Sequence, residues 1–163
     1  KYFNEFEKRF LSGELYEADS IKVADSLKFK TKKGRIVYGG GGIIPDVFVS
    51  IEKNHNKEGL ELLLQSDIMS YYAFEKLDEN RAFFSKMNKS ELKKELFKTD
   101  KYFNQFKEYV TSNGLLFNLS DQKEQILTYL YAEFSKQLFN DTSYYQIVLP
   151  GDKMIKKVLE KQK

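Results

Sequence analysis

Hydrophobic and polar residues alternate in a short segment near the start of the chain. Over residues 27–32, Leu, Phe and Thr alternate with lysines, which is the two-residue period of a strand with one solvent-exposed face. Residues 35–38, Arg-Ile-Val-Tyr, are again rich in β-branched and aromatic types. With Lys32-Lys33-Gly34 between them, the two segments predict a β-hairpin with a short glycine-containing turn. A further short strand is predicted over residues 47–51.

Elsewhere the apolar residues follow the three-to-four-residue spacing of amphipathic helices. Phe3, Phe6 and Phe10 predict a helix over residues 1–12 that ends at Gly13. From about residue 57 the helical spacing continues to the end of the chain. The positions that carry it are Leu60, Leu63, Leu64, Ile68, Tyr71, Tyr72, Leu92, Leu96, Tyr102, Phe103, Phe106, Val110, Ile126, Leu127, Leu130, Tyr131, Phe134 and Leu138.

Local signals also predict where several of these helices begin and end. Asparagine or aspartate followed three residues later by glutamate is the spacing of a capping box, and a lone aspartate can cap a helix by itself. The expected starts are, in chain order, Asn88 with Glu91, Asp100, and Asp121 with Glu124. The expected ends are Asn113-Gly114 and Pro150-Gly151, and the latter separates the segments Tyr144–Leu149 and Lys153–Leu159.

These patterns predict an α+β fold that is mainly α and has two parts. Residues 1–52 should contain a helix, the hairpin, a glycine-rich crossing and a strand, and residues 53–163 should form a helical domain. No apolar run is long enough to span a membrane, so no membrane span is expected in this chain.

Composition narrows the chemistry that the chain can perform. There is no cysteine, which excludes disulfides, thiolate nucleophiles and thiolate metal sites. The 27 basic and 24 acidic residues are interspersed, and a net charge of +3 without a concentrated basic face does not favour nucleic acid. The one basic cluster, expected to be a solvated helix face, is Lys153, Lys156, Lys157, Lys161 and Lys163.

Four consecutive glycines, Gly39 to Gly42, are the least ordinary feature of the sequence. A phosphate-binding loop would need a Lys-Ser/Thr pair or a following helix, whereas Ile43-Ile44-Pro45 follows here. A flexible linker would carry polar filler rather than flanking β-branched residues. The run therefore favours a tight crossing of β-structure, in which glycine lets another backbone or a bound peptide come close.

No set of residues in the sequence completes a catalytic or metal site. His55, the single histidine, has no acidic or histidine neighbour at ligand spacing and is expected in an exposed loop. No metal and no cofactor is predicted. A lysine acts as a general base only when it is desolvated, and the Ser-Lys combinations lie on polar helix faces. They are Ser85-Lys86, Ser90 with Lys94, and Ser135-Lys136.

Aromatic residues make up 15% of the chain. They could form a platform on which RNA bases stack, or they could pack within the protein. Their helical spacing, without interleaved basic residues, favours packing in a core or an interface. So many aromatics also suggest that part of the surface packs on another domain. The residues concerned are Tyr71, Tyr72, Phe83, Phe84, Tyr144 and Tyr145.

The segment from Phe29 to Val49, FKTKKGRIVYGGGGIIPDVFV, resembles a stretch of the carboxyl-terminal processing, or tail-specific, serine proteases. In that family the form Thr-x-x-Gly-Arg-x-(Val/Ile)-x-Gly-x-Gly-Ile-x-Pro-Asp-(Val/Ile) follows the catalytic core. Residues 13–31 and 62–81 are also similar to the long form common in Bacteroidetes-like bacteria. The positions that carry over, as structure flanking the protease core, are Gly34, Arg35, Gly40, Gly42, Pro45 and Asp46.

The resemblance implies an endopeptidase of the periplasm or cell envelope whose PDZ domain binds the C-terminal tails of protein substrates. Its serine nucleophile would be activated by a lysine held neutral by partial burial. The family's small-residue serine motif and its Phe-Gly-Lys-Gly-like turn occur nowhere in residues 1–163, so no catalytic residue is assigned. The chain is therefore expected to be a non-catalytic, structural or assembly-related C-terminal portion that can form a homo-oligomer. The alternative is a helical protein–protein interaction module without protease activity.

Overall fold

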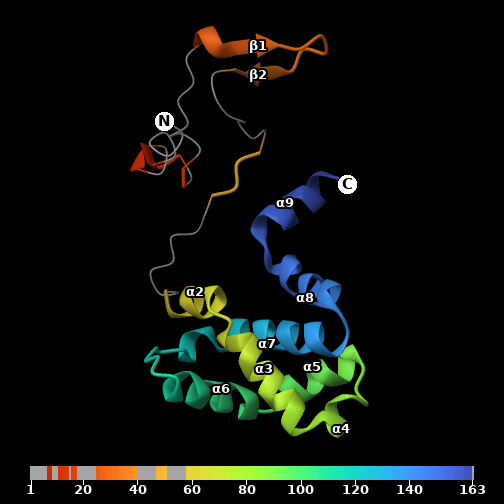
Figure 1. The fold of residues 1–163 in the computed structure, drawn as a ribbon. Coiled ribbons are helices and arrows are strands. Elements are labelled where there is room, and N and C mark those ends of the chain that lie inside the picture. Colours follow the sequence, from red (N-terminus) through yellow and green to blue (C-terminus); the bar gives the residue numbers. More distant parts are fainter. Residues whose placement is uncertain are drawn as a thin grey trace. The chain divides into compact units, whose positions relative to one another are not determined.

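The computed structural model describes residues 7–8, 11–14, 16–17, 25–39, 47–50 and 58–162. The chain divides into two compact units, Lys1–Lys53 and Asn54–Lys163 (Figure 1). Helices dominate the described residues, and the strands form one small two-stranded sheet, which confirms the predicted α+β, mainly α class. The division lies one residue from the boundary expected between residues 52 and 53. The assignment of the first unit to a protease core remains a prediction.

The predicted hairpin forms in the first unit. Strand β1, Lys28–Lys30, follows the 3-10 turn η2, Asp25–Leu27, and pairs antiparallel with β2, Ile36–Tyr38. Backbone bonds close the connecting turn, from the Gly34 amide to the Thr31 carbonyl at 2.9 Å and from the Thr31 amide to the Arg35 carbonyl at 2.8 Å. Gly34 has φ +82°, a left-handed conformation that costs glycine little, so this residue fits the turn for a backbone reason.

Two other predictions for the first unit are tested only in part. Within 1–12 the described residues 7, 8 and 11 are helical, the Ser12 amide bonds to the Lys8 carbonyl at 2.8 Å, and Gly13 follows with φ +84°. The predicted strand over 47–51 is wrong for residues 47–50, which are irregular. A strand needs a neighbour for its backbone groups, and no described residue pairs with these four.

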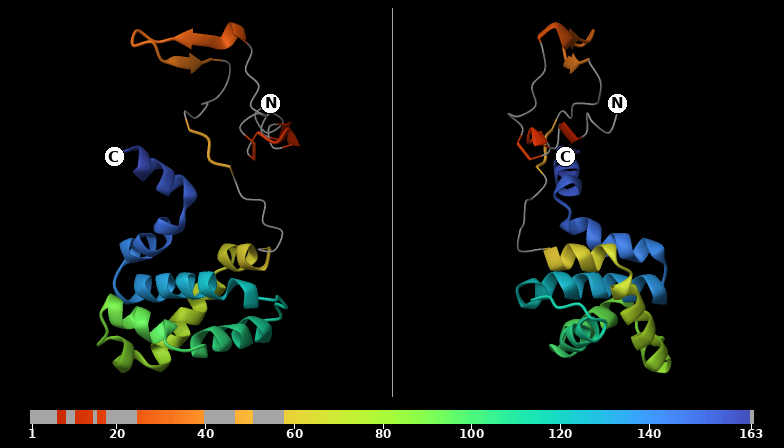
Figure 2. Two further views of the ribbon diagram at one scale, coloured as in Figure 1. Left: turned by 180° about the vertical axis from the view of Figure 1, so that it is seen from behind. Right: turned by 60° about the vertical axis from the view of Figure 1, so that its left-hand side comes forward.

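The second unit is a bundle of helices built around α7. Helix α7 contacts α3, α5, α6 and α8 and lies in the middle of the bundle in the views of Figures 1 and 2. In chain order the elements are α2 Glu58–Gln65, α3 Ile68–Glu79, α4 Arg81–Phe84, α5 Lys89–Phe97, α6 Lys101–Ser112, η4 Ser120–Gln122, α7 Lys123–Leu138, α8 Asp141–Val148, η5 Leu149–Gly151 and α9 Lys153–Lys161. None of the described helices is both long enough and apolar enough to cross a membrane.

Aromatic rings fill much of the core between these helices. Tyr72, Phe84, Phe106 and Phe134 are fully or almost fully buried. The Tyr72 ring lies 5.2 Å from that of Phe106, and the Phe84 ring 5.5 Å from that of Phe134, with tilted or edge-on geometry. Such pairs add to the free energy gained by removing apolar area from water. The predicted apolar positions of α5, α6 and α7 are buried here, except Leu138, which is half-buried.

The predicted capping box of α5 is confirmed. The Asn88 side chain accepts hydrogen bonds from the Ser90 and Glu91 amides at 2.9 and 3.1 Å, and the Glu91 carboxylate accepts one from the Asn88 amide at 2.9 Å. These bonds satisfy backbone donors that a helix start leaves without partners. Glycine also ends α6 as predicted, because Gly114 follows Asn113 with φ +81°.

The side-chain caps predicted for the other two helix starts are wrong. Asp100 precedes α6 but makes no capping bond, because its carboxylate pairs instead with the Lys123 ammonium at the start of α7. Asp121 lies in η4, and α7 begins two residues later without a side-chain cap. Leu119, 1% exposed, anchors that 3-10 turn in the core, so tertiary packing displaces the local signal.

A break between α2 and α3 was not predicted, because the apolar spacing runs through it unchanged. The Ser66 hydroxyl donates a hydrogen bond to the Leu63 carbonyl at 3.0 Å, and α3 begins after Asp67. Serine and aspartate offer the backbone alternatives to the helical pattern, which favours a break at this point.

Candidate functional site

The predicted motif residues divide between described and undescribed parts of the chain. Gly34 and Arg35 lie together in the hairpin turn, where the Arg35 amide donates to the Thr31 hydroxyl at 3.1 Å. Gly40, Gly42, Pro45 and Asp46 lie outside the described residues, as does His55. The structure therefore brings two of the six motif positions into one turn.

None of the three Ser-Lys combinations forms a nucleophile–base pair. The ammonium-bearing side chains of Lys86, Lys94 and Lys136 are all exposed, so none is desolvated as a general base must be. The Ser135 hydroxyl is buried on α7 without a hydrogen-bond partner among the described residues, while Lys136 extends over the Tyr144 ring at 5.9 Å. Nor do the described residues contain a group of three or more acidic or histidine side chains able to hold a metal.

Two adjoining pockets beside α4 and α5 offer a candidate site among the described residues of the second unit. The larger, called here the lysine pocket, has a volume of about 850 Å³ and is open to solvent. The smaller, called the tyrosine pocket, has a volume of about 320 Å³ and shares Phe83 and Glu95 with it. The lysine pocket is lined by Phe83, Lys86, Met87, Glu91, Lys94, Glu95, Phe97 and Lys98. The tyrosine pocket is lined by Lys76, Glu79, Asn80, Phe83, Phe84, Glu95, Lys101, Tyr102 and Gln105.

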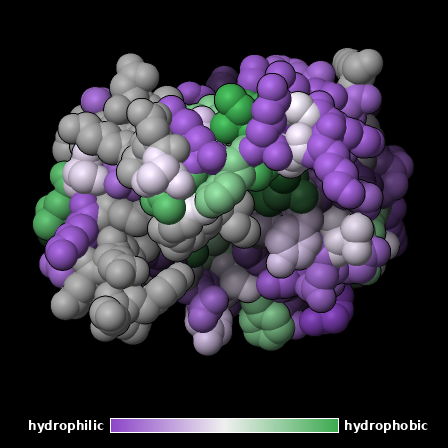
Figure 3. All heavy atoms as spheres, turned by 90° about the horizontal axis from the view of Figure 1, so that it is seen from above, coloured by the Kyte–Doolittle hydropathy of each residue, from purple (hydrophilic) through white to green (hydrophobic). Residues whose placement is uncertain are grey.

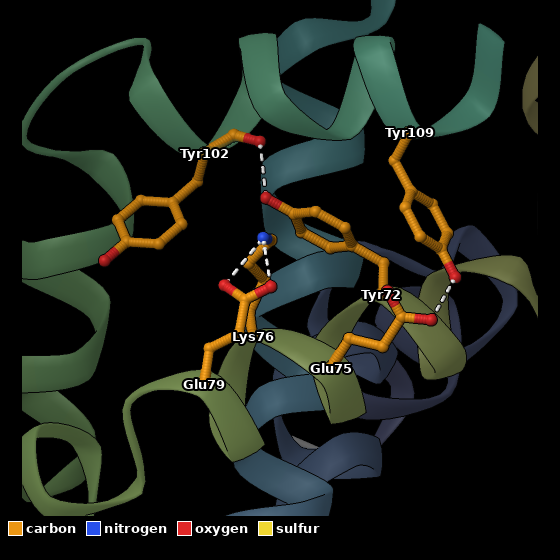
Figure 4. Close-up of polar contacts among 6 residues, drawn as sticks. All are labelled: Tyr72, Glu75, Lys76, Glu79, Tyr102 and Tyr109. Carbon is orange, nitrogen blue, oxygen red and sulfur yellow. Dashed lines mark hydrogen bonds and ion pairs between the residues drawn. The ribbon is translucent and has the colours of Figure 1, made fainter. Parts of the chain in front are cut away.

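Charges in the tyrosine pocket are largely neutralised within the chain. The Lys76 ammonium contacts both oxygens of Glu79 at 2.8 Å (Figure 4). The Tyr102 hydroxyl donates to Glu95 Oε1 at 3.1 Å, and Lys101 Nζ lies 5.1 Å from the Tyr102 ring centre. With its ionic groups engaged in this way, this pocket holds helices together and offers a ligand little unsatisfied polarity.

Buried tyrosines connect this pocket to the core. Figure 4 shows Tyr72 reaching from α3 to the backbone of α6, where its hydroxyl donates to the Tyr102 carbonyl at 3.2 Å. The neighbouring Tyr109 hydroxyl donates to Glu75 Oε1 at 3.0 Å. Burial raises the pKa of the Tyr72 and Tyr102 phenols, and the Glu95 carboxylate raises that of Tyr102 further. Both phenols therefore remain protonated donors at neutral pH and do not act as bases.

The lysine pocket has a different charge balance. The Lys86, Lys94 and Lys98 ammoniums form no ion pair with any described residue. Both carboxylates of its lining already accept hydrogen bonds, Glu91 from the Asn88 amide and Glu95 from the Tyr102 hydroxyl. Phe83 and Phe97 remain 49% and 37% exposed. This pocket thus combines apolar surface with unengaged positive charge.

Lys86, Lys94, Glu91 and Phe83 each belong to another sequence pattern, and none of those patterns predicted the lysine pocket. One signal was available on α5 and its C-cap. Glu91, Lys94, Glu95 and Lys98 follow at spacings of three and four residues, which places them on one helix face. The contribution from α4 depends on the path of the turn over residues 85–88, which helical spacing does not specify.

Other apolar side chains of the second unit also remain exposed. Tyr71 on α3 is 60% exposed and Tyr145 on α8 is 57% exposed, whereas Tyr72 and Phe84 are buried as predicted. No described residue of α9 is buried, and Met154, Val158 and Leu159 lie on one apolar face of that helix. Figure 3 shows hydrophobic residues reaching the surface among hydrophilic ones.

Residues 60–140 match the model of a family of unknown function (DUF8443). The match runs from α2 to the end of α7 and so includes both pockets and the aromatic core. No curated protein and no solved structure matches the chain.

Proposed function

We propose that this chain is the C-terminal, non-catalytic portion of a carboxyl-terminal processing endopeptidase of the Ser/Lys type. The observation that carries the proposal is the resemblance of residues 29–49 to a family segment, with Gly34 and Arg35 at its Gly-Arg positions. In support, these two residues lie in a hairpin turn where Gly34 adopts the positive φ that favours glycine.

In the complete enzyme a serine hydroxyl would attack the scissile carbonyl, and a neutral lysine would take its proton and return it to the leaving amine. Backbone amides would stabilise the tetrahedral oxyanion. These groups, and the PDZ domain that binds substrate tails, would lie upstream of Lys1 in a protein of the periplasm or cell envelope. The substrates would be proteins with exposed C-terminal tails.

Within that enzyme the helical unit would have a structural or assembly role. Its buried aromatic core supports a self-contained domain, and its exposed aromatics support a surface that packs on another domain or on a second copy. A non-catalytic role agrees with the exposed lysines of the Ser-Lys combinations.

The second candidate is a helical interaction module without protease activity. One observation favours it: the family match covers residues 60–140 and leaves the hairpin outside. A module that occurs without the hairpin would not depend on a protease core.

The distinguishing experiment compares this chain with the gene product that contains it and its upstream residues. A fluorogenic peptide with a free C-terminus is the substrate, and a variant without the upstream serine is the control. We expect cleavage by the longer protein, no cleavage by its serine variant, and none by residues 1–163 alone. Hydrolysis by residues 1–163 would overturn the non-catalytic assignment. An upstream region that lacks the serine motif and the Phe-Gly-Lys turn would favour the interaction module.

A further inference from the structure

The lysine pocket carries an inference that does not depend on the protease proposal. Its apolar lining consists of Phe83, Met87 and Phe97, which come from α4, the turn after it and α5. A volume of about 850 Å³ is within the range of sites that hold small molecules or short peptide segments. Large apolar side chains left in contact with water in such a recess gain free energy when another apolar group covers them.

The charged residues of the lining indicate which polar group a ligand should carry beside its apolar one. Lys86, Lys94 and Lys98 line the recess without an ion pair to any described residue. The carboxylates of Glu91 and Glu95 are already hydrogen-bonded, one in the α5 capping box and the other to Tyr102. An incoming carboxylate can therefore bind ammonium groups without first breaking an internal ion pair of theirs.

We propose that the lysine pocket binds a peptide segment of a partner protein in which a carboxylate lies next to a large apolar side chain. The apolar side chain covers Phe83 and Phe97, and the carboxylate contacts the lysine ammoniums. A nucleic acid fits less well, because the unpaired positive charge is confined to three side chains and does not form an extended basic face. The carboxylate is that of an aspartate or glutamate side chain of the segment, and a protein C-terminus is the competing ligand that the test distinguishes.

The test uses the whole chain and three fluorescein-labelled hexapeptides of matched apolar composition. The first has leucine and phenylalanine next to a free C-terminal carboxylate. The second is the same peptide with an amidated C-terminus, and the third is amidated but carries glutamate beside the leucine. Fluorescence anisotropy measures affinity, and amide chemical-shift changes in labelled protein locate the binding.

We expect the third peptide to bind at least about tenfold more tightly than the second, equivalent to about 1.4 kcal/mol. Tight binding of the first peptide but not of the third would overturn the internal acidic segment and identify a protein C-terminus as the ligand. The shifted amides should cluster at residues 83–87 and 91–98. Equal affinity for all three peptides, no binding, or shifts elsewhere would overturn the proposal.

A matched pair of variants tests the charge requirement. The pocket variant carries Lys86→Gln, Lys94→Gln and Lys98→Gln, and the control carries Lys136→Gln, Lys156→Gln and Lys161→Gln, which removes the same charge at exposed positions of α7 and α9. Affinity should fall about tenfold in the pocket variant and remain unchanged in the control. An equal loss in both variants would assign binding to net charge and contradict a specific site. The chemical-shift map of the unsubstituted protein decides the question if the pocket variant does not fold.

Discussion

The Tyr72 hydroxyl donates a 3.2 Å hydrogen bond to the backbone carbonyl of Tyr102, so a side chain of α3 is tied to the first turn of α6. The two residues are 30 positions apart, and both side chains are buried. The bond satisfies the one polar group of a ring that otherwise packs against Phe106 and Phe134.

Replacing Tyr72 with Phe removes this bond and keeps the packing of the ring. We expect the free energy of unfolding to fall by about 1 kcal/mol, the typical net value of such a bond. Urea denaturation followed by circular dichroism measures the change. Tyr71→Phe is the matched control, because Tyr71 is 60% exposed on the same helix and should leave the midpoint unchanged. Equal effects of the two substitutions would contradict a stabilising role for the bond.

Ser135 and Ser143 form a second matched pair, since both are completely buried. The Ser135 hydroxyl has no partner among the described residues, whereas the Ser143 hydroxyl donates to the Asn140 side chain at 3.0 Å. Ser135→Ala should leave the free energy of unfolding unchanged or raise it by up to about 1 kcal/mol. Ser143→Ala should lower the free energy of unfolding by about 1 kcal/mol. Destabilisation by Ser135→Ala would show that its hydroxyl is engaged.

Replacing Asn88 with alanine should destabilise the protein more than replacing Asp100, because only Asn88 caps its helix. Asn88→Ala removes the side-chain oxygen that accepts from the Ser90 and Glu91 amides, and should cost about 1 kcal/mol. Asp100→Ala removes no cap, only a solvent-exposed ion pair with Lys123, and should cost less than about 0.5 kcal/mol. Differential scanning calorimetry at low salt and at 1 M salt separates the two. The Asn88 effect should persist in salt, and the Asp100 effect should shrink.

Glu133 predicts a dependence of stability on pH. Burial raises the pKa of its carboxyl above the ordinary 4.5, while Lys136 and Ser70 lower it less, and Asp67 opposes them. Because the folded chain holds this proton more tightly, the residue lowers stability as pH rises from about 4.5 through its folded pKa. Glu133→Gln should therefore raise the melting temperature at pH 7 and have no effect below about pH 4.

Glu124→Gln is the control for this prediction, on the first turn of the same helix. An exposed glutamate at a helix N-terminus is stabilising, so its removal should lower the melting temperature at pH 7 by a small amount. A stabilising effect of Glu133→Gln that is equal at pH 4 and pH 7 would contradict the role of burial.

Helix α9 should contribute to self-association of the chain more than to the thermal stability of the bundle. None of its described residues is buried, so deletion after Gly151 should leave the thermal midpoint of the bundle nearly unchanged. Loss of exposed Met154, Val158 and Leu159 should reduce any self-association that sedimentation velocity detects. Val158→Gln with Leu159→Gln should reproduce that reduction in the full-length helix. A large loss of stability on deletion would contradict the peripheral position of α9.

Local features of this chain were predictable where one short segment determines them. The hairpin turn at Gly34, the α5 capping box and the end of α6 at Gly114 all confirm sequence patterns, because their hydrogen bonds or backbone angles arise within a few residues. Buried positions on α5, α6 and α7 were also predictable, since helical spacing identifies the face that leaves water.

Features that depend on distant residues were not predictable. Asp100 has the sequence of a cap but pairs with Lys123, which lies 23 positions away and is brought near only by packing. The lysine pocket lies within residues 83–98, but it needs the turn after α4 to fold against one face of α5, and helical spacing does not specify the path of that turn. Of the six motif positions, the described residues include Gly34 and Arg35, so the rest of the glycine crossing stays a prediction.

The chain contains no tryptophan, and Tyr72 and Tyr102 are among the described tyrosines that are buried in the aromatic core. Their near-ultraviolet dichroism should therefore report tertiary order in the bundle without any added label. Because burial raises their pKa values, they should ionise on unfolding and not with the exposed phenols during alkaline titration. A single introduced tryptophan, for example Phe97→Trp at the lysine pocket, would be the sole indole of the protein and a direct optical sensor of that pocket.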